Sequence, residues 1–526
     1  MEVLVRWLYE RTSMMIHPSG NARKYQVLCA SSVKKRTRFR LRTERRSIPA
    51  GLAFFQTNFY PSTGRPLNRS CHAVDPNGQK IRMLLFIVCV RILLINKSSR
   101  PMNVRAGTSQ TSDDPANLRE AAVATAVAVV IISTLYLTTP VMTAFDDGLH
   151  YLDLAEKGLW NNDALTAPYA YRFGAPMIVR FLHGAFGLPV WSGFMCLSIA
   201  SAYCLLIASY RLARASGSSH PGGLIVLTAI GFSFFHVRFP LAAPTMVDVE
   251  GFALLVVAIL LLLRKKTVMC LVVSCLGLLF KEFLIIPPVL LIVQQAMEYR
   301  RTKAILPLRW ILVTLLAVIF FFVAPRVILP IRVGYGANFR WDFGSSQRMG
   351  YLKNLRTFLP AVPDAGRIVN IVLAFLSYWL PVILLSTPGR LVRVWRESTL
   401  FRPAIIVCTT ATAALALIGG TNIMIFAAYS VPAMILTLAR LRETGTKSIE
   451  TAAMLIAVCL FNRIPWTLGN GGMKEIAGFY GAWWSLVDGV TLERFLEILG
   501  WVLLLALVRF LVQRAAPKDS GGVATQ

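Results

Sequence analysis

The feature that most constrains this chain is a series of apolar runs that starts near residue 120 and continues almost to the C-terminus. A helix needs about 20 mostly apolar residues to cross the hydrocarbon core of a bilayer, and runs such as 190–210 and 308–330 reach that length. Hydrophobic residues make up 55% of the chain and charged residues 15%, whereas a soluble protein carries about 25% charged residues. The sequence therefore predicts an all-α polytopic membrane protein.

About twelve transmembrane helices are expected, with roughly 10 to 13 as the range, because several apolar runs are shorter than a full span. Their predicted ranges are 120–141, 190–210, 222–238, 250–263, 267–280, 283–296, 308–330, 368–386, 403–419, 423–439, 449–464 and 495–512. Three long connections, 142–189, 331–367 and 465–494, separate some of these helices and are rich in aromatic residues.

The basic residues indicate how the chain is oriented. If the N-terminus is cytoplasmic, the inner connections hold 17 Lys and Arg in 64 residues, and the outer ones hold 12 in 131. This bias is about threefold in the direction of the positive-inside rule. We therefore expect both termini to be cytoplasmic and the three long connections to face outward, in what we interpret as a bacterial cytoplasmic (inner) membrane.

Three regions follow from this map. Residues 1–118 are basic and without sustained periodicity, which predicts a disordered N-terminal extension. Residues 119–513 form the polytopic membrane domain, and 514–526 form a short cytoplasmic tail. The formal net charge of +29 could suggest a nucleic-acid partner. Beyond residue 119, however, the basic residues lie between apolar runs, where membrane topology explains them, so we expect no nucleic acid.

A polar stripe follows the first predicted span. Asp146, His150, Asp153 and Lys157 are four, three and four residues apart, so they share one face of a helix. Leu149, Leu152, Ala155 and Leu159 recur on the other face, which predicts an amphipathic surface helix in the first outer loop. Asp147 makes Asp146 part of an acidic pair, and neighbouring carboxylates raise each other's proton affinity, which suits one of them to act as a general base. The simpler alternative is a helix-capping aspartate followed by a solvated face.

Three motifs in this layout resemble the C-class (GT-C) integral-membrane glycosyltransferases. Phe145-Asp146-Asp147-Gly148 resembles the acidic motif in their first outer loop. The segment 168–176 (PYAYRFGAP) resembles the aromatic-Arg-Pro segment before the second span, and Lys281-Glu282 resembles the charged pair between two short helices. The resemblance implies many transmembrane helices, a polyprenyl-phosphate-linked sugar as donor and inverting transfer to a glycan, lipid or protein acceptor. It also implies Asp146 and Asp147 as the catalytic residues, with Asp146 as the base.

The chemistry of such a transfer also needs cations to hold the departing phosphate. Arg172 and Lys281, with Arg238 or His236 in addition, lie on the outer side of the predicted map. We assign Arg172, Lys281, Glu282, His150 and Arg238 as candidate substrate-binding residues. Asp248 and Glu250 are weaker candidates, because carboxylates are ordinary at the start of a helix. No cluster with metal-ligand spacing occurs, so we expect neither a metal nor another cofactor.

Other classes of membrane protein stay open at this point. A secondary transporter or a flippase for lipid-linked glycans is the first alternative, and a polymerase-like or non-catalytic membrane protein is the second. Transporters place charged residues near the middle of the membrane, often in broken helices. A transferase would instead gather its polar residues at one outer face, around the acidic pair. The location of the polar side chains therefore discriminates between these classes.

Overall fold

The computed structural model of the chain describes residues 115–139, 141, 147–160, 169–329, 365–398, 401–418, 423–444, 446 and 448–462, with single positions between 500 and 510. Throughout these residues every regular element is a helix, which confirms the predicted all-α class. The predicted N-terminal extension, the acidic residue Asp146, the loops 331–367 and 465–494 and the C-terminal tail lie wholly or largely outside the described residues.

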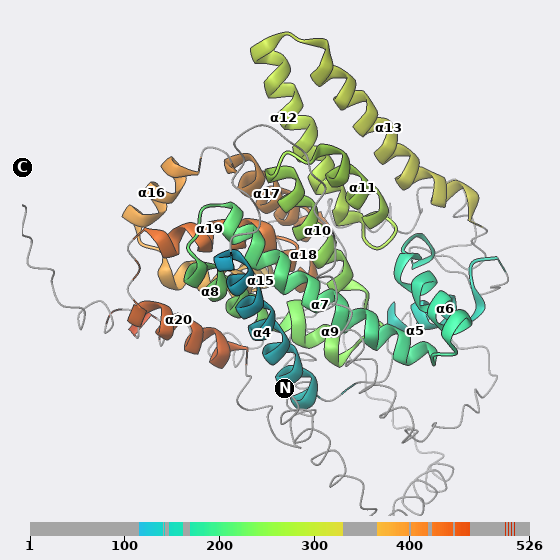
Figure 1. Cartoon of the computed structure of the whole chain (residues 1–526), viewed down its shortest axis with the longest axis horizontal. Helices are drawn as coiled ribbons and strands as arrows, with labels where there is room; N and C mark the ends of the chain where they lie inside the picture. The colour runs from blue at the N-terminus through green and yellow to red at the C-terminus, as the bar shows by residue number, and fades with distance from the viewer. Residues whose placement is uncertain are drawn as a thin grey trace, which may run out of the picture. The chain divides into compact units, whose positions relative to one another are not determined.

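Figure 1 shows the helices in chain order. The first are α4 (Pro115–Thr138), α5 (Asp147–Lys157), η1 (Tyr169–Tyr171), α6 (Gly174–Phe186), α7 (Val190–Ala215), α8 (His220–Gly231), η2 (Phe234–Arg238), α9 (Phe239–Ala242) and α10 (Asp248–Leu263). Then come α11 (Thr267–Gly277), η3 (Glu282–Ile285), α12 (Ile286–Thr302), α13 (Ile305–Ile328), α15 (Ala365–Leu385), α16 (Pro388–Glu397), α17 (Arg402–Ile418), α18 (Ile423–Ala428), α19 (Val431–Glu443) and α20 (Ser448–Phe461).

Three of the described helices are long and apolar enough to cross a membrane: Leu118–Thr138, α7 and α13. Two bent pairs raise this number to five if each pair is one span. They are α8 with 234–242, bent by 70°, and α16 with the first part of α17, bent by 117°. The predicted runs 267–280 and 283–296 instead correspond to α11 and α12, which are separated by a tight non-helical turn at 278–281.

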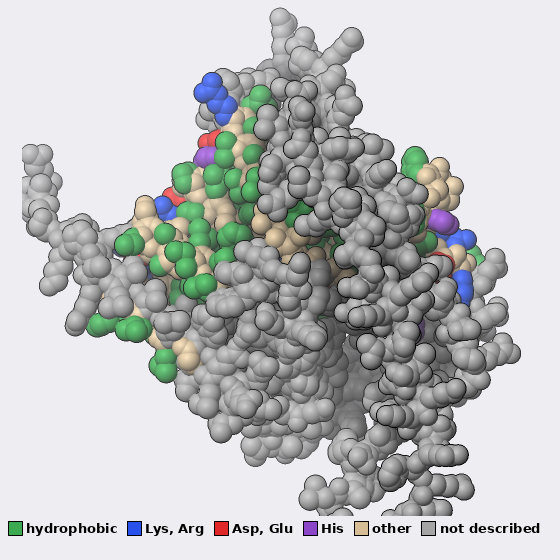
Figure 2. Space-filling model, turned by 90° about the horizontal axis from the view of Figure 1, so that it is seen from below, with side chains coloured by type: hydrophobic (Ala, Val, Ile, Leu, Met, Phe, Trp, Pro, Cys, Tyr) green, Lys and Arg blue, Asp and Glu red, His purple; other side chains and the backbone are tan. Residues whose placement is uncertain are grey.

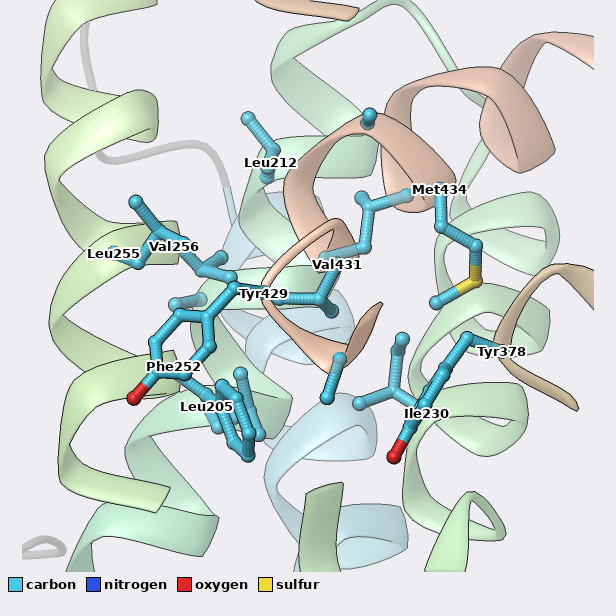
Figure 3. Packing of buried hydrophobic residues seen from close by; sticks show 14 of the residues in the cluster. Leu205, Leu212, Ile230, Phe252, Leu255, Val256, Tyr378, Tyr429, Val431 and Met434 are labelled. Carbon is cyan, nitrogen blue, oxygen red and sulfur yellow. The ribbon is translucent and has the colours of Figure 1, made fainter. Parts of the chain in front are cut away.

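The core is built around α7 and α10, which pack against each other and against α8, α11 and α19. Leucine, valine and aromatic side chains fill it. Phe252, Leu255 and Val256 of α10 face Tyr429 and Val431 from the region where α18 meets α19 (Figure 3). In a bilayer, where the lipid tails are as apolar as these side chains, close van der Waals packing holds such helices together.

Many apolar side chains are nevertheless exposed. Helix α13, which pairs with α12 (Figure 1), exposes Leu312, Leu316 and Phe320 to 56%, 58% and 64%. Hydrophobic side chains also cover much of the coloured surface on the face shown in Figure 2. A soluble monomer rarely leaves apolar surface of this extent uncovered. The exposed stripe of α13 is what a helix in contact with lipid requires.

Candidate active site

Glycine contacts bring four segments of the chain together: the start of α5, the segment after η1, the residues that lead into α10 and the turn before η3. Gly148 of α5 lies against Thr245, so closely that an added Cβ would collide with its hydroxyl. The Gly174 amide donates to the Leu279 carbonyl at 2.8 Å, and a Cβ at Gly174 would lie 2.6 Å from the Phe280 ring. These contacts bring together charged residues that are far apart in the sequence. We call Asp147, Tyr151, Arg172, Asp248, Lys281, Glu282 and Arg326 the charged cluster.

Arg172 and Glu282 form the central ion pair of the cluster. Nε of Arg172 donates to both carboxylate oxygens of Glu282 at 3.0 Å. A second nitrogen, Nη1, reaches the hydroxyl of Tyr151 at 3.4 Å. The side chains of Arg172 and Glu282 retain exposed fractions of 18% and 30%, so a ligand can approach this pair.

Lys281 pairs with a different carboxylate. Its Nζ lies 2.7 Å from Oδ1 of Asp248, the first residue of α10, and both side chains are buried. Lys281 has an extended backbone (φ −153°, ψ 142°), and successive side chains of an extended segment point to opposite sides. Lys281 therefore turns toward α10 while Glu282 turns toward Arg172. The adjacent residues do not neutralise each other.

Tyr151 anchors α5 in the cluster, because its side chain is fully buried. Its ring meets Tyr169 edge-on, with the centroids 5.8 Å apart, and His150 stacks on the same Tyr169 ring at 4.3 Å. The predicted apolar face of the helix is confirmed except at Leu149, which is 54% exposed. Ala155 is fully buried, and Leu152 and Leu159 pack against buried clusters. Gly148, Tyr151 and Leu154 are buried as well, and hydropathy alone does not mark the glycine or the tyrosine as a core residue.

Arg326 adds a third cation to the cluster. It lies in the last turn of α13, and its Nη2 is 4.0 Å from Oε1 of Glu282. Its guanidinium also stacks over the Tyr171 ring, 4.6 Å from the centroid. Arg326 is not among the site residues predicted from the sequence. A single arginine in the last turn of a long apolar helix, at the end expected to face outward, is the signal that would have indicated it.

The charges in the cluster act on one another. Burial alone would raise the pKa of Glu282, but the Arg172 guanidinium lowers it below the ordinary value. Burial would likewise lower the pKa of Lys281, and Asp248 raises it instead. Burial raises the pKa of Tyr151, opposed by Arg172 and Lys281. The adjacent residues Lys281 and Glu282 thus each keep their charge through a partner from another part of the chain, Asp248 for Lys281 and Arg172 for Glu282.

The other predicted site residues have different surroundings. Asp146 lies outside the described residues. Arg238 is almost fully buried, and its Nε donates to the Thr139 hydroxyl at 3.3 Å. His236 is also fully buried, with its ring nitrogens 2.8 Å from the Ser233 hydroxyl and 3.1 Å from the Ala428 carbonyl. Both lie in the π-helical turn η2, and their contacts there are those of packed core residues.

A second polar network lies at the far end of α7, which at 26 residues is about 39 Å long. Arg214 and His220 both face Glu120 of α4, at 3.1 and 3.9 Å. Glu443, the last residue of α19, accepts hydrogen bonds from Ser219 N and Oγ at 2.9 and 2.7 Å. Apart from Asp153–Lys157 along the short helix α5, the described ion pairs therefore join residues at or near helix ends and in connections.

Within the described residues, no group of three or more His, Cys, Asp or Glu side chains could hold a metal ion. Comparison of the chain with protein-family models, with curated proteins and with solved structures finds no match. The function must therefore be argued from the charged cluster itself.

Proposed function

We propose that this protein is an integral-membrane glycosyltransferase that moves a sugar from a polyprenyl-phosphate donor to an acceptor on the outer face of the membrane. The observation that carries the proposal is the charged cluster. Asp147 follows the first span and begins α5, whose Tyr151 hydroxyl contacts Arg172. Arg172 and Arg326 both face Glu282, and Lys281 precedes Glu282 in the chain and pairs with Asp248. Transfer from a lipid phosphate needs a carboxylate to accept a proton and cations to stabilise the leaving phosphate.

Each residue then has a role. The acidic pair Asp146-Asp147 supplies the general base for the acceptor hydroxyl. Arg172 and Arg326 bind the donor phosphate, and Glu282 keeps the Arg172 guanidinium in place through its two 3.0 Å hydrogen bonds. His150 covers the Tyr169 ring beside this pair and offers a flat surface to a sugar. The sugar itself and the nature of the acceptor, whether glycan, lipid or protein, follow from the test below.

The proposal includes the finer topology. About twelve spans would place both termini in the cytoplasm and the charged cluster outside. Two facts support this arrangement. The charged cluster reaches the start of α7, where Tyr151 packs with Phe194, and the Glu120–Arg214 network lies at its other end. Two of the basic connections, 211–221 and 440–448, meet at this second network. A transporter would place charged pairs along the middle of the bundle, whereas the described ion pairs lie near the ends of the long helices, in connections or along the short helix α5.

The test is transfer of a labelled sugar. The acceptor is supplied by membranes from the native host after its gene for this protein has been deleted. The purified full chain is added to these membranes together with one of a panel of polyprenyl-phosphate sugars. Loss of a general base lowers the rate by about 10²–10⁴-fold, so Asp146→Asn or Asp147→Asn should reduce transfer by that factor. Asp153→Asn is the matched control, because Asp153 lies on the same helix but pairs with Lys157. It should retain full transfer. Full transfer by both Asp146→Asn and Asp147→Asn would remove the main support for the proposal.

A further inference from the structure

Tyr429 lies at the break between α18 and α19, and its side chain is fully buried. The ring stacks on Phe283 with the centroids 3.8 Å apart and the planes 3° from parallel, and it contacts Phe252 of α10 at 4.6 Å. Phe283 follows Lys281 and Glu282 in the chain. The Tyr429 ring lies beside Phe252 in the buried core (Figure 3), and through Phe283 it reaches the turn that carries Lys281 and Glu282.

The hydroxyl of Tyr429 lies beside Lys281. A Cβ built on Gly251 would be 2.6 Å from this hydroxyl and 3.1 Å from Cγ of Lys281. The Tyr429 hydroxyl and the Lys281 side chain therefore both pack against Gly251 of α10, one turn after Asp248. Glycine is required here because any side chain would push the hydroxyl or the lysine away.

The chain on both sides of Tyr429 is held by hydrogen bonds. Nε1 of Trp379 donates to the Ser430 hydroxyl at 2.9 Å, and the Ala428 carbonyl lies 3.1 Å from His236 Nε2. The direction of the ring is therefore set by its neighbours.

The Tyr429 hydroxyl itself has no hydrogen-bond partner among the described residues. A buried polar group without a partner destabilises the fold, and buried hydroxyls are nearly always paired. Phenylalanine would fill the same stack on Phe283 without that cost. The geometry points to a hydroxyl that is retained for a bound ligand.

We infer that Tyr429 is a ligand-binding residue whose hydroxyl donates a hydrogen bond to a phosphate oxygen of the donor, beside Lys281. This inference rests on the proposed function and extends it, because it adds a neutral donor from the C-terminal half of the bundle to the cations of the charged cluster. A hydroxyl that donates to an oxyanion forms a short, charge-assisted hydrogen bond. Lys281 is buried, but Glu282, the next residue, keeps 30% exposure, so the accessible part of the cluster begins one residue away from the lysine beside this hydroxyl.

The experiment compares the purified full chain with its Tyr429→Phe variant. The matched control is Tyr378→Phe, since Tyr378 is another buried tyrosine of the same core, packed beside Phe235 and His236. Thermal unfolding is measured without ligand and with increasing farnesyl phosphate, farnesol or inorganic phosphate. Farnesol lacks the phosphate and inorganic phosphate lacks the lipid, so the three probes separate the two parts of the ligand.

Without ligand, Tyr429→Phe should unfold at the same temperature as the wild type or higher, because it removes an unpaired buried hydroxyl. Its affinity for farnesyl phosphate should fall about 10- to 100-fold, the range for one hydrogen bond to a charged group. Its response to farnesol should not change, and Tyr378→Phe should bind farnesyl phosphate like the wild type.

Two results would overturn the inference and leave the proposed function standing. One is a Tyr429→Phe variant with a lower unfolding temperature and unchanged affinity, which would make the hydroxyl structural. The other is an equal loss of affinity for farnesol and farnesyl phosphate, which would assign the ring to the lipid chain. A wild-type protein that farnesyl phosphate does not stabilise would contradict the proposed donor and this inference together.

Discussion

Asp248→Asn should strongly destabilise the protein, because it leaves the Lys281 ammonium buried without its counterion. The two groups are 2.7 Å apart, with side-chain exposures of 2% for Asp248 and 8% for Lys281. At such exposure, water cannot replace the lost carboxylate. Removing one partner of a buried ion pair costs about 3–5 kcal/mol, whereas replacing both partners by uncharged residues is often nearly neutral.

The double variant Asp248→Asn/Lys281→Met therefore provides the comparison. We expect it to be more stable than Asp248→Asn alone, since no unpaired charge remains. Reversible unfolding of the purified chain in mixed micelles gives the free energy for the wild type, the two single variants and the double variant. The four values form a cycle whose coupling energy should exceed about 1 kcal/mol. A double variant whose loss of stability equals the sum of the two single losses would refute the reasoning, because the pair would then be uncoupled.

Three further outcomes are expected. The Arg172 guanidinium lowers the pKa of Glu282, so the stability that this pair contributes is present above pH 4.5, the ordinary value, and is lost as the pH falls through the lowered value. When the unfolding temperature is measured against pH, the Glu282→Gln variant should show a smaller decrease at acidic pH than the wild type. Gly174→Ala should cost about 1–3 kcal/mol through overpacking against Phe280, while Gly184→Ala, where an added Cβ meets no atom within 4 Å, should not destabilise in the same unfolding assay. A cysteine introduced near Asn162 should react with an impermeant reagent in intact cells, and reaction only after the cells are opened would reverse the topology.

Much of the fold could be predicted from apolar runs alone. The runs 120–141, 190–210 and 308–330 became helices of spanning length, because a helix satisfies its own backbone hydrogen bonds in lipid. Breaks were harder to predict. The run 222–238 divides between α8 and η2, and 423–439 divides between α18 and α19. A local break of this kind depends on partners elsewhere, such as Asn462, whose side-chain oxygen accepts from the Phe234 amide at 2.9 Å.

The sequence predicted which residues belong to the candidate site better than it predicted which of them pair with one another. Arg172, Lys281 and Glu282 were selected from short motifs, and the structure brings them together. Their partners were not predictable, because Arg172 and Glu282 are 110 residues apart and hydropathy carries no information about such contacts. Tyr429 could not be found from sequence for the same reason. Inside an apolar run, one tyrosine has no feature that separates it from packing residues.

Because the backbone at Lys281 is extended, no residue can be inserted between Lys281 and Glu282 without changing which way the two side chains point. Lys281 faces Asp248 and Glu282 faces Arg172 because consecutive side chains alternate. One extra residue between them would reverse this alternation and turn Glu282 toward Asp248, so two carboxylates would meet while Arg172 lost its partner. Surface loops of a membrane protein usually tolerate insertions. This turn should not, and insertion scanning should find a sharp boundary at 281–282 even though the turn belongs to no helix core.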